Sequence, residues 1–188
     1  MQPETVVLLN SEHQPIGTQL KSEVHQATTP LHLAFSCFLF NSKGELLLQQ
    51  RALTKITWPG VWSNSCCGHP LPNEEIEAAV HRRLRHELNL KDIDVKVILP
   101  NYKYKASFLG IMENELCPVY IGFTNQEPKP NPAEVENTKW QSWSELINAL
   151  KNPDDNSWDH LSIWCREEAL LLDENPLFKE LWSHNCTN

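Results

Sequence analysis

The chain has 188 residues, the usual length of one globular domain with a single core. It has 16 Lys and Arg residues and 24 Asp and Glu residues, so the formal net charge is −8. Such an acidic chain is not expected to coat nucleic acid or an anionic membrane. The content of 40% hydrophobic and 21% charged residues is that of a folded protein. No apolar run reaches the roughly 18 to 20 residues of a membrane span, and residues 1–5 do not resemble a signal peptide, so we expect a cytoplasmic protein.

The first half of the chain is predicted to contain strands followed by one long helix. Residues 51–71 have too many Gly and Pro for a helix. Between Glu74 and Leu88, apolar residues recur every three or four positions, with acids first and arginines later, which predicts a helix. The predicted strands are residues 5–10, 16–24, 31–40 and 46–51.

The second half is predicted to change from strands to helices. In the segment 159–172, one helical face is apolar and contains Leu161, Trp164, Cys165, Ala169 and Leu172. With no internal repeat or linker, the pattern predicts one α+β domain, a mixed sheet flanked by helices. The predicted strands are 95–99, 102–106, 116–123 and 135–143, and the predicted helices are 144–150, 159–172 and 176–182.

The cysteines are scattered, apart from one adjacent pair. Without an export signal or a repeated C-x-x-C spacing, we expect reduced thiols and neither a disulfide framework nor a zinc ribbon. At least one thiol is then free to act as a nucleophile or an acid/base group. The six are Cys37, Cys66, Cys67, Cys117, Cys165 and Cys186.

Three histidines and two glutamates form a candidate metal site. Glu113 and Glu115 project to the same side of an extended chain, because side chains alternate with period two. His25, His32 and His69 come from three separate segments. Nitrogen and oxygen ligands suit manganese, iron or magnesium better than a thiolate zinc site. Spacing alone leaves open that each histidine is merely a surface or hydrogen-bonded residue.

The segment from residue 68 to residue 87 has the frame of the Nudix box, Gly68-x5-Glu74-x7-Arg82-Arg83-Leu84-Arg85-His86-Glu87. In hydrolytic members, glutamates of this box hold the metal ions that activate water. Arg83 and His86 stand where two of those glutamates are expected, while Glu74 and Glu87 remain. The arginines of this helix also fit a solvent-exposed charged face.

Specific motifs recur along the chain, above all Cys-Gly-His-Pro at 67–70 and Glu-Asn-Glu at 113–115. Over about residues 5–165, the chain resembles the type 1 isopentenyl-diphosphate delta-isomerases, divergent members of the Nudix superfamily. This resemblance implies a single domain, 1–188, with a Nudix-like core at about 30–165, a mixed sheet sandwiched by helices, an added N-terminal strand segment and C-terminal helices. The matching segments are 31–36, 50–52, 58–62, 64–70, 102–104 and 113–118.

The resemblance also implies two metal sites. Glu87 is expected to help hold a magnesium ion that accompanies the substrate diphosphate. The other site is expected to hold one divalent ion, manganese or magnesium, with zinc as an alternative. Its implied ligands are His25, His32, His69, Glu113 and Glu115.

Roles in catalysis and substrate binding follow from the same resemblance. Cys67 and Glu115 are the implied acid/base pair, Tyr104 hydrogen-bonds to one of them, and Trp164 stabilises a carbocation through its ring face. Which of the pair gives the proton stays open. The implied cationic contacts to the diphosphate are Lys21, Arg51, Lys55 and Arg83.

The expected function is therefore isomerisation of isopentenyl diphosphate to dimethylallyl diphosphate, by a monomer whose partner is a small prenyl diphosphate. One alternative is a Nudix-type diphosphate hydrolase, favoured by the box frame and disfavoured by Arg83, His86 and the Cys67/Glu115 pair. A second alternative is a structural metal-binding domain without catalysis. Incubation with isopentenyl diphosphate and magnesium separates the three.

Overall fold

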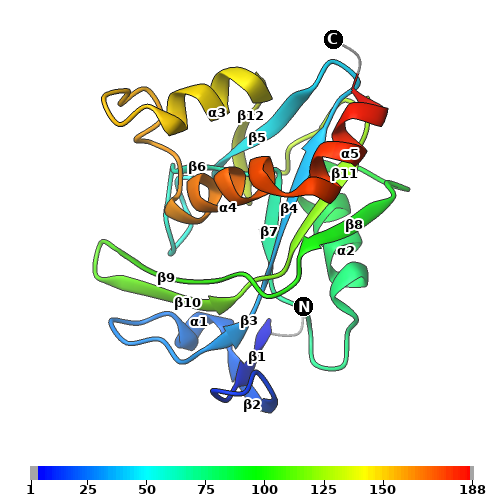
Figure 1. Cartoon of the computed structure of the whole chain (residues 1–188). Coiled ribbons are helices and arrows are strands. Elements are labelled where there is room, and N and C mark those ends of the chain that lie inside the picture. Colours follow the sequence, from blue (N-terminus) through cyan, green and yellow to red (C-terminus); the bar gives the residue numbers. More distant parts are fainter. Residues whose placement is uncertain (1–3, 187–188) are drawn as a thin grey trace.

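The computed structural model describes residues 4–186 and contains two β-sheets with helices packed around them (Figure 1). The smaller sheet has the spatial order β2 (Pro15–Leu20), β1 (Thr5–Leu9), β3 (His32–Leu33), β10 (Ile111–Leu116) and β9 (Lys103–Phe108). The path of the larger sheet is β12 (Val135–Ser142), β5 (Glu45–Arg51), β4 (Phe35–Phe40), β11 (Val119–Phe123) and β8 (Val95–Leu99). Off this path, β6 (Trp62–Ser63) pairs with β5, and β7 (Cys66–Gly68) pairs with β4.

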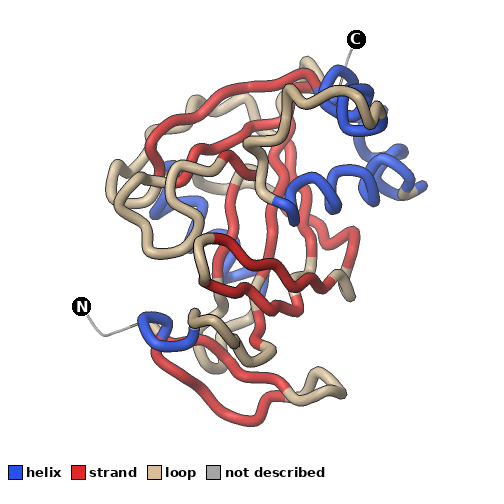
Figure 2. Tube along the Cα trace, turned by 90° about the vertical axis from the view of Figure 1, so that its left-hand side faces the viewer, coloured by secondary structure: helices blue, strands red, loops and turns tan. Residues whose placement is uncertain are grey.

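The helices cover both faces of the larger sheet. Along β4, side chains alternate between the faces, so Phe38 and Phe40 pack with three of the helices while Cys37 and Leu39 pack with α2. The smaller sheet lies at the opposite end of the molecule from the C-terminal helix (Figures 1 and 2). The helices are α1 (Lys21–Val24), α2 (Ile76–Leu88), α3 (Trp143–Lys151), α4 (Ile163–Glu174) and α5 (Pro176–Asn185). This α+β architecture, with mixed sheets and helices, confirms the predicted fold class.

The two sheets meet at a seam, where two neighbouring chain segments pass side by side from the smaller sheet into the larger one. Strand β3 pairs in parallel with β10, and after a short break β4 pairs in parallel with β11. Ala34 N–H donates to the carbonyl of Leu116 at 2.9 Å, and Ser36 N–H donates to the carbonyl of Pro118 at 3.1 Å. The sequence predictions of single strands at 31–40 and 116–123 were wrong, because Pro118 has no N–H for a continuous ladder.

Several boundaries also differ from the predicted ones. The segment 16–24 is extended only to Leu20 and then turns into α1, which buries Val24. The strand predicted at 102–106 continues to Phe108 and pairs with β10, which was not predicted as a strand of its own. The helix predicted at 159–172 begins at Ile163, because the Ser162 side chain accepts from the N–H of Cys165 and caps it.

The predicted helix at 74–88 is α2, and it begins two residues later than expected. Its buried side chains include Leu84 and Leu88, as the three-to-four spacing predicts, but also the charged Arg83 and Glu87. No helix within residues 4–186 has the length and apolar character needed to cross a membrane.

Candidate active site and metal centre

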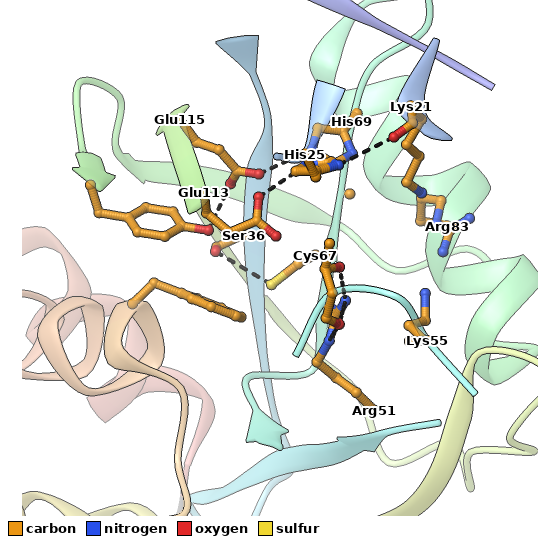
Figure 3. Close-up of a pocket in the computed structure, with 14 residues that line it drawn as sticks. Lys21, His25, Ser36, Arg51, Lys55, Cys67, His69, Arg83, Glu113 and Glu115 are labelled. Carbon is orange, nitrogen blue, oxygen red and sulfur yellow. Dashed lines mark hydrogen bonds and ion pairs between the residues drawn. The ribbon is translucent and has the colours of Figure 1, made fainter. Parts of the chain in front are cut away.

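The candidate site is a cavity at the seam between the two sheets, shown in Figure 3. The histidines and carboxylates lie on one side of Cys67, and the basic side chains of Arg51, Lys55 and Arg83 lie on the other. Trp164 of α4 also lines the cavity. Among the predicted site residues, the cavity brings together Lys21, His25, Arg51, Lys55, Cys67, His69, Arg83, Tyr104, Glu113, Glu115 and Trp164.

Three imidazoles and one carboxylate converge on one point, and a second carboxylate borders them. The ligand atoms of His25, His32, His69 and Glu115 all lie within 4.8 Å of one another. His69 Nε2 is 3.0 Å from Glu115 Oε1, and His32 Nε2 is 3.3 Å from the same oxygen. Glu113 joins the group through its Oε2, which lies 2.9 Å from His25 Nε2. All five residues of the predicted metal site are therefore adjacent.

The orientation of the imidazole rings fits a metal ion. His25 Nδ1 lies 3.3 Å from the carbonyl of Lys21, and His32 Nδ1 lies 3.0 Å from the carbonyl of Pro30. With Nδ1–H donating to these carbonyls, each Nε2 presents a lone pair to the centre. Those Nε2 atoms and Glu113 Oε2 are buried without a hydrogen-bond partner in the described part of the chain. Buried lone pairs that face one another in this way are satisfied by a cation.

The electrostatics of the group lead to the same conclusion. Burial lowers the pKa of His69 to about 3, so this ring is a neutral ligand at neutral pH. Burial opposes ionisation of Glu115, but His32 and His69 outweigh it and hold its pKa well below its usual value. Burial and the charge of Glu115 raise the pKa of Glu113. Two adjacent buried carboxylates are costly together, and a divalent cation removes that cost.

Cys67 and Glu115 are held by separate hydrogen-bond partners. The Cys67 thiol donates to Asn64 Oδ1 at 3.1 Å and lies 3.6 Å from Ser36 Oγ. Burial raises the pKa of Cys67 to about 12, so it carries its proton at neutral pH. The Tyr104 hydroxyl donates to Glu115 Oε2 at 2.9 Å. The predicted acid/base pair thus has one protonated and one ionised member, with Tyr104 bound to the ionised one.

Trp164 is held in place beside Tyr104. Its Nε1–H donates to Ser63 Oγ at 2.9 Å, and its ring centroid lies 5.4 Å from that of Tyr104. Trp58 packs edge-on against it with a centroid distance of 5.0 Å. The indole is therefore held rigidly, with its polar atom satisfied and its ring available to the cavity.

The predicted basic residues line the cavity but are already paired. Lys21 Nζ lies 2.7 Å from Glu4 Oε2, and Lys55 forms an ion pair with Glu134. The Arg51 guanidinium donates to the carbonyls of Thr57 and Trp58 at 2.8 to 3.2 Å. These partners were not expected from sequence, since no pattern links residue 4 or residue 134 to the cavity.

Arg83 and Glu87 form a buried pair. Arg83 Nη2 lies 2.7 Å from Glu87 Oε1 and 3.0 Å from Glu134 Oε2. Both Arg83 and Glu87 are almost fully buried, so the solvent-exposed helix face that the arginines also fitted is wrong for Arg83. The predicted magnesium ligand Glu87 lies beside Arg83 and apart from the histidine group.

Comparison with known proteins places these features in a family. Residues 30–176 match the NUDIX domain family. The chain is 49% identical over 173 residues to an isopentenyl-diphosphate Delta-isomerase from Saccharopolyspora erythraea, covering 91% of this chain and 87% of the relative. It is 45% identical over 183 residues to an enzyme of the same name from Clavibacter michiganensis subsp. michiganensis, covering 97% and 90%.

Solved structures show the same fold at lower sequence identity. The crystal structure of DR0079 from Deinococcus radiodurans aligns with a TM-score of 0.67 and 19% identity, covering 88% of this chain and 97% of that chain. The MutT protein from Methanosarcina mazei aligns with a TM-score of 0.58 and 17% identity, covering 78% and 97%. These two likenesses concern the fold alone.

The metal centre predicts a stability gain on ion binding. At a manganese concentration 100 times the dissociation constant, binding adds about 2.7 kcal/mol, which raises the Tm of a chain this long by about 5 to 10 °C. Chelator-treated protein is melted with and without added manganese, and protease cleavage before residue 35 is followed in parallel. His25→Ala abolishes both effects, whereas His184→Ala, an exposed histidine on α5, preserves them. An identical Tm and cleavage rate with and without metal would contradict the shared site.

The cationic side chains that line the cavity, Lys21, Arg51, Lys55 and Arg83, are called the basic wall here. Their ion pairs predict that the stability of the protein depends on pH. Burial opposes ionisation of Glu134, but Arg83 and Lys55 outweigh it and lower its pKa to about 2. A depressed carboxyl pKa contributes stability above the unfolded value, near 4.5, and that contribution is lost as the pH falls towards 2. Glu134→Gln is therefore less stable than the parent at pH 7 in urea unfolding, and the gap narrows below pH 4.5. Exposed Glu136→Gln is the control, and a gap that does not change with pH would refute the ion-pair account.

Proposed function

The chain belongs to the isopentenyl-diphosphate Delta-isomerases of the NUDIX family, and we propose that it converts isopentenyl diphosphate to dimethylallyl diphosphate. One observation carries this proposal. Cys67 and Glu115 line the same cavity, next to Trp164 and a set of basic side chains, and burial raises the pKa of the thiol while His32 and His69 hold the pKa of the carboxyl down. We also propose a monomeric cytoplasmic enzyme whose single domain spans the chain.

The reaction moves one proton onto the alkene and removes another from the allylic carbon. It passes through a state that resembles a tertiary carbocation, so both groups must reach the substrate without water. A buried thiol that carries a proton and a carboxylate that lacks one form such a pair. After one forward turnover, one member of the pair has lost a proton and the other has gained one, so a proton must return between them, directly or through solvent, before the next forward turnover. Because the reaction is reversible, Cys67 and Glu115 exchange roles with its direction.

The remaining side chains hold the pair and the cation-like carbon in place. Tyr104 binds the oxygen of Glu115 that the histidines leave free. The face of Trp164 stabilises the developing positive charge by roughly 1 to 2 kcal/mol. A manganese or magnesium ion held by His25, His32, His69, Glu113 and Glu115 would supply positive charge that anchors Glu115.

The diphosphate is bound by the basic wall. Lys21, Lys55 and Arg83 exchange their carboxylate partners for phosphate oxygens, and Arg51 adds a planar donor pair. When Arg83 turns to the phosphates, Glu87 is left as the proposed ligand of a second magnesium ion. Arg83 stands where the box of a hydrolase has a glutamate, and this replacement favours binding of the diphosphate over its hydrolysis.

The decisive experiment is product analysis. Purified protein is incubated with isopentenyl diphosphate and magnesium. Dimethylallyl diphosphate as product supports the isomerase. Released phosphate or pyrophosphate would identify a hydrolase, and unchanged substrate would leave only a structural metal-binding role.

Replacement of the proposed acid/base thiol tests its role directly. Cys67→Ala is expected to lower kcat by about 10²- to 10⁴-fold, because the sulfur moves a proton, while metal and diphosphate binding stay nearly unchanged. Turnover assays and binding of inorganic pyrophosphate measure the two effects. Cys66→Ala, next to it and fully buried, is expected to be mild. If both variants lose activity to the same extent, the defect lies in folding and Cys67 has no special role.

Restoring the acids of the hydrolytic box tests the basic wall. Arg83→Glu with His86→Glu is expected to lose isomerisation through weaker diphosphate binding, by several-fold to hundreds-fold, since a cation at the phosphates becomes an anion. Efficient hydrolysis is not expected, because the pocket presents the alkene rather than the diphosphate bridge to its acid/base pair. Exposed Arg85→Glu, on the same helix, is the control. Unchanged KM and kcat in the double variant would place Arg83 outside the substrate site.

A further inference from the structure

Helix α4 buries a carboxyl group, that of Glu168. Glu168 of α4 has no exposed surface, and it follows Trp164 by one helical turn. Both of its carboxyl oxygens are buried without a hydrogen-bond partner of regular geometry among residues 4–186. Its helix neighbours Cys165, Ala169 and Leu172 are buried and apolar. A leucine or methionine would pack on such a face at lower cost than an acid.

The surroundings of Glu168 favour its neutral form. Burial raises its pKa well above the usual value, and the Ser36 hydroxyl and Cys117 thiol offset only part of that rise. A neutral carboxylic acid has one O–H to donate, which a carboxylate lacks. The titratable groups that act on it are Glu115, Glu167 and Cys117, and it acts in turn on Cys67, Tyr102 and Cys165.

The Ser36 hydroxyl interacts both with the Glu168 carboxyl and with the Cys67 thiol. This hydroxyl lies 3.6 Å from Cys67 Sγ and 3.5 Å from Cys117 Sγ, so its hydrogen can be donated to either of two sulfurs. Figure 3 shows the contact with Cys67 at the edge of the cavity. If the neutral carboxyl of Glu168 donates its O–H to Ser36 Oγ, the hydrogen of Ser36 is left for a sulfur.

We propose that Glu168 is a positioning residue for Cys67, a carboxylic acid that acts through the Ser36 hydroxyl to hold the thiol in its orientation towards the substrate. This inference rests on the proposed isomerase function. Asn64 and Ser36 then hold the sulfur from two directions, Asn64 Oδ1 as acceptor and Ser36 O–H as donor. Misorientation of a reacting group by about 1 Å is enough to cost 10²-fold in rate.

Two substitutions separate this role from simple packing. Glu168→Gln keeps a donor of the same shape and is expected to retain kcat within about threefold. Glu168→Met fills the space without a donor and is expected to lower kcat by about 10- to 100-fold, with KM within twofold of the parent and a Tm that is equal or higher. Glu167→Met, its exposed neighbour, is expected to change none of these values.

A double-mutant cycle tests the route through Ser36. Ser36→Ala is expected to lower kcat as Glu168→Met does, and the combined variant is expected to be no slower than Ser36→Ala alone, because the two residues act in one chain. Additive losses would overturn the connection through Ser36. If kcat falls equally in the Gln and Met variants, Glu168 does not act as a hydrogen-bond donor. It then acts through a negative charge or by transferring a proton.

The remaining outcomes also decide the question. A Glu168→Met enzyme with kcat within twofold of the parent would reduce Glu168 to a core residue. If Glu168→Met and Glu168→Leu both fail to fold, the carboxyl is a structural requirement and the proposal is overturned. A parent protein that does not isomerise isopentenyl diphosphate overturns the proposed function itself, which is distinct from an active parent with an equally active Met variant.

Discussion

The carboxylate of Glu115 is the interaction on which the site depends. One oxygen faces His32 and His69, and the other accepts the Tyr104 hydroxyl. It is almost fully buried, so its charge persists because these partners, and a metal ion when one is bound, compensate for lost hydration. Strand β10 supplies Glu115, β3 supplies His32 and β9 supplies Tyr104, so the pairing of three strands of the smaller sheet positions this one group.

The sequence was sufficient for the parts of the fold governed by local pattern. Alternation predicted that Glu113 and Glu115 share a side, and the three-to-four spacing predicted α2. Local patterns could not predict that the strands divide into two sheets. The 31–40 segment is almost continuously apolar, and it divides at Ala34 because its partner segment contains Pro118, which has no N–H to donate to the ladder. Long-range pairing of this kind leaves no mark in a local window.

The same distinction separates the site residues that sequence identified from those it missed. Ligand chemistry and motif resemblance pointed to the histidines, which the fold brings to one group of adjacent ligand atoms. Glu4 and Glu134 were missed because they are joined to their cations only by tertiary structure. Glu168 left a weak signal, an acid at a position where the helical pattern of Trp164, Cys165 and Leu172 calls for an apolar residue. Acids at such positions are candidates for function, because they oppose stability.

The charge balance of the basic wall gives a physical reason for a metal ion with the substrate. Glu4 is about half exposed, so it can enter water when a phosphate takes its place at Lys21. Glu87 is buried to 2% exposure and has no such path. If Arg83 turns to the diphosphate, the Glu87 carboxylate is left in a site where an unpaired charge costs several kcal/mol. A buried acid that releases its ion-pair partner Arg83 needs another cation, and we propose that the diphosphate brings one by binding as its magnesium complex.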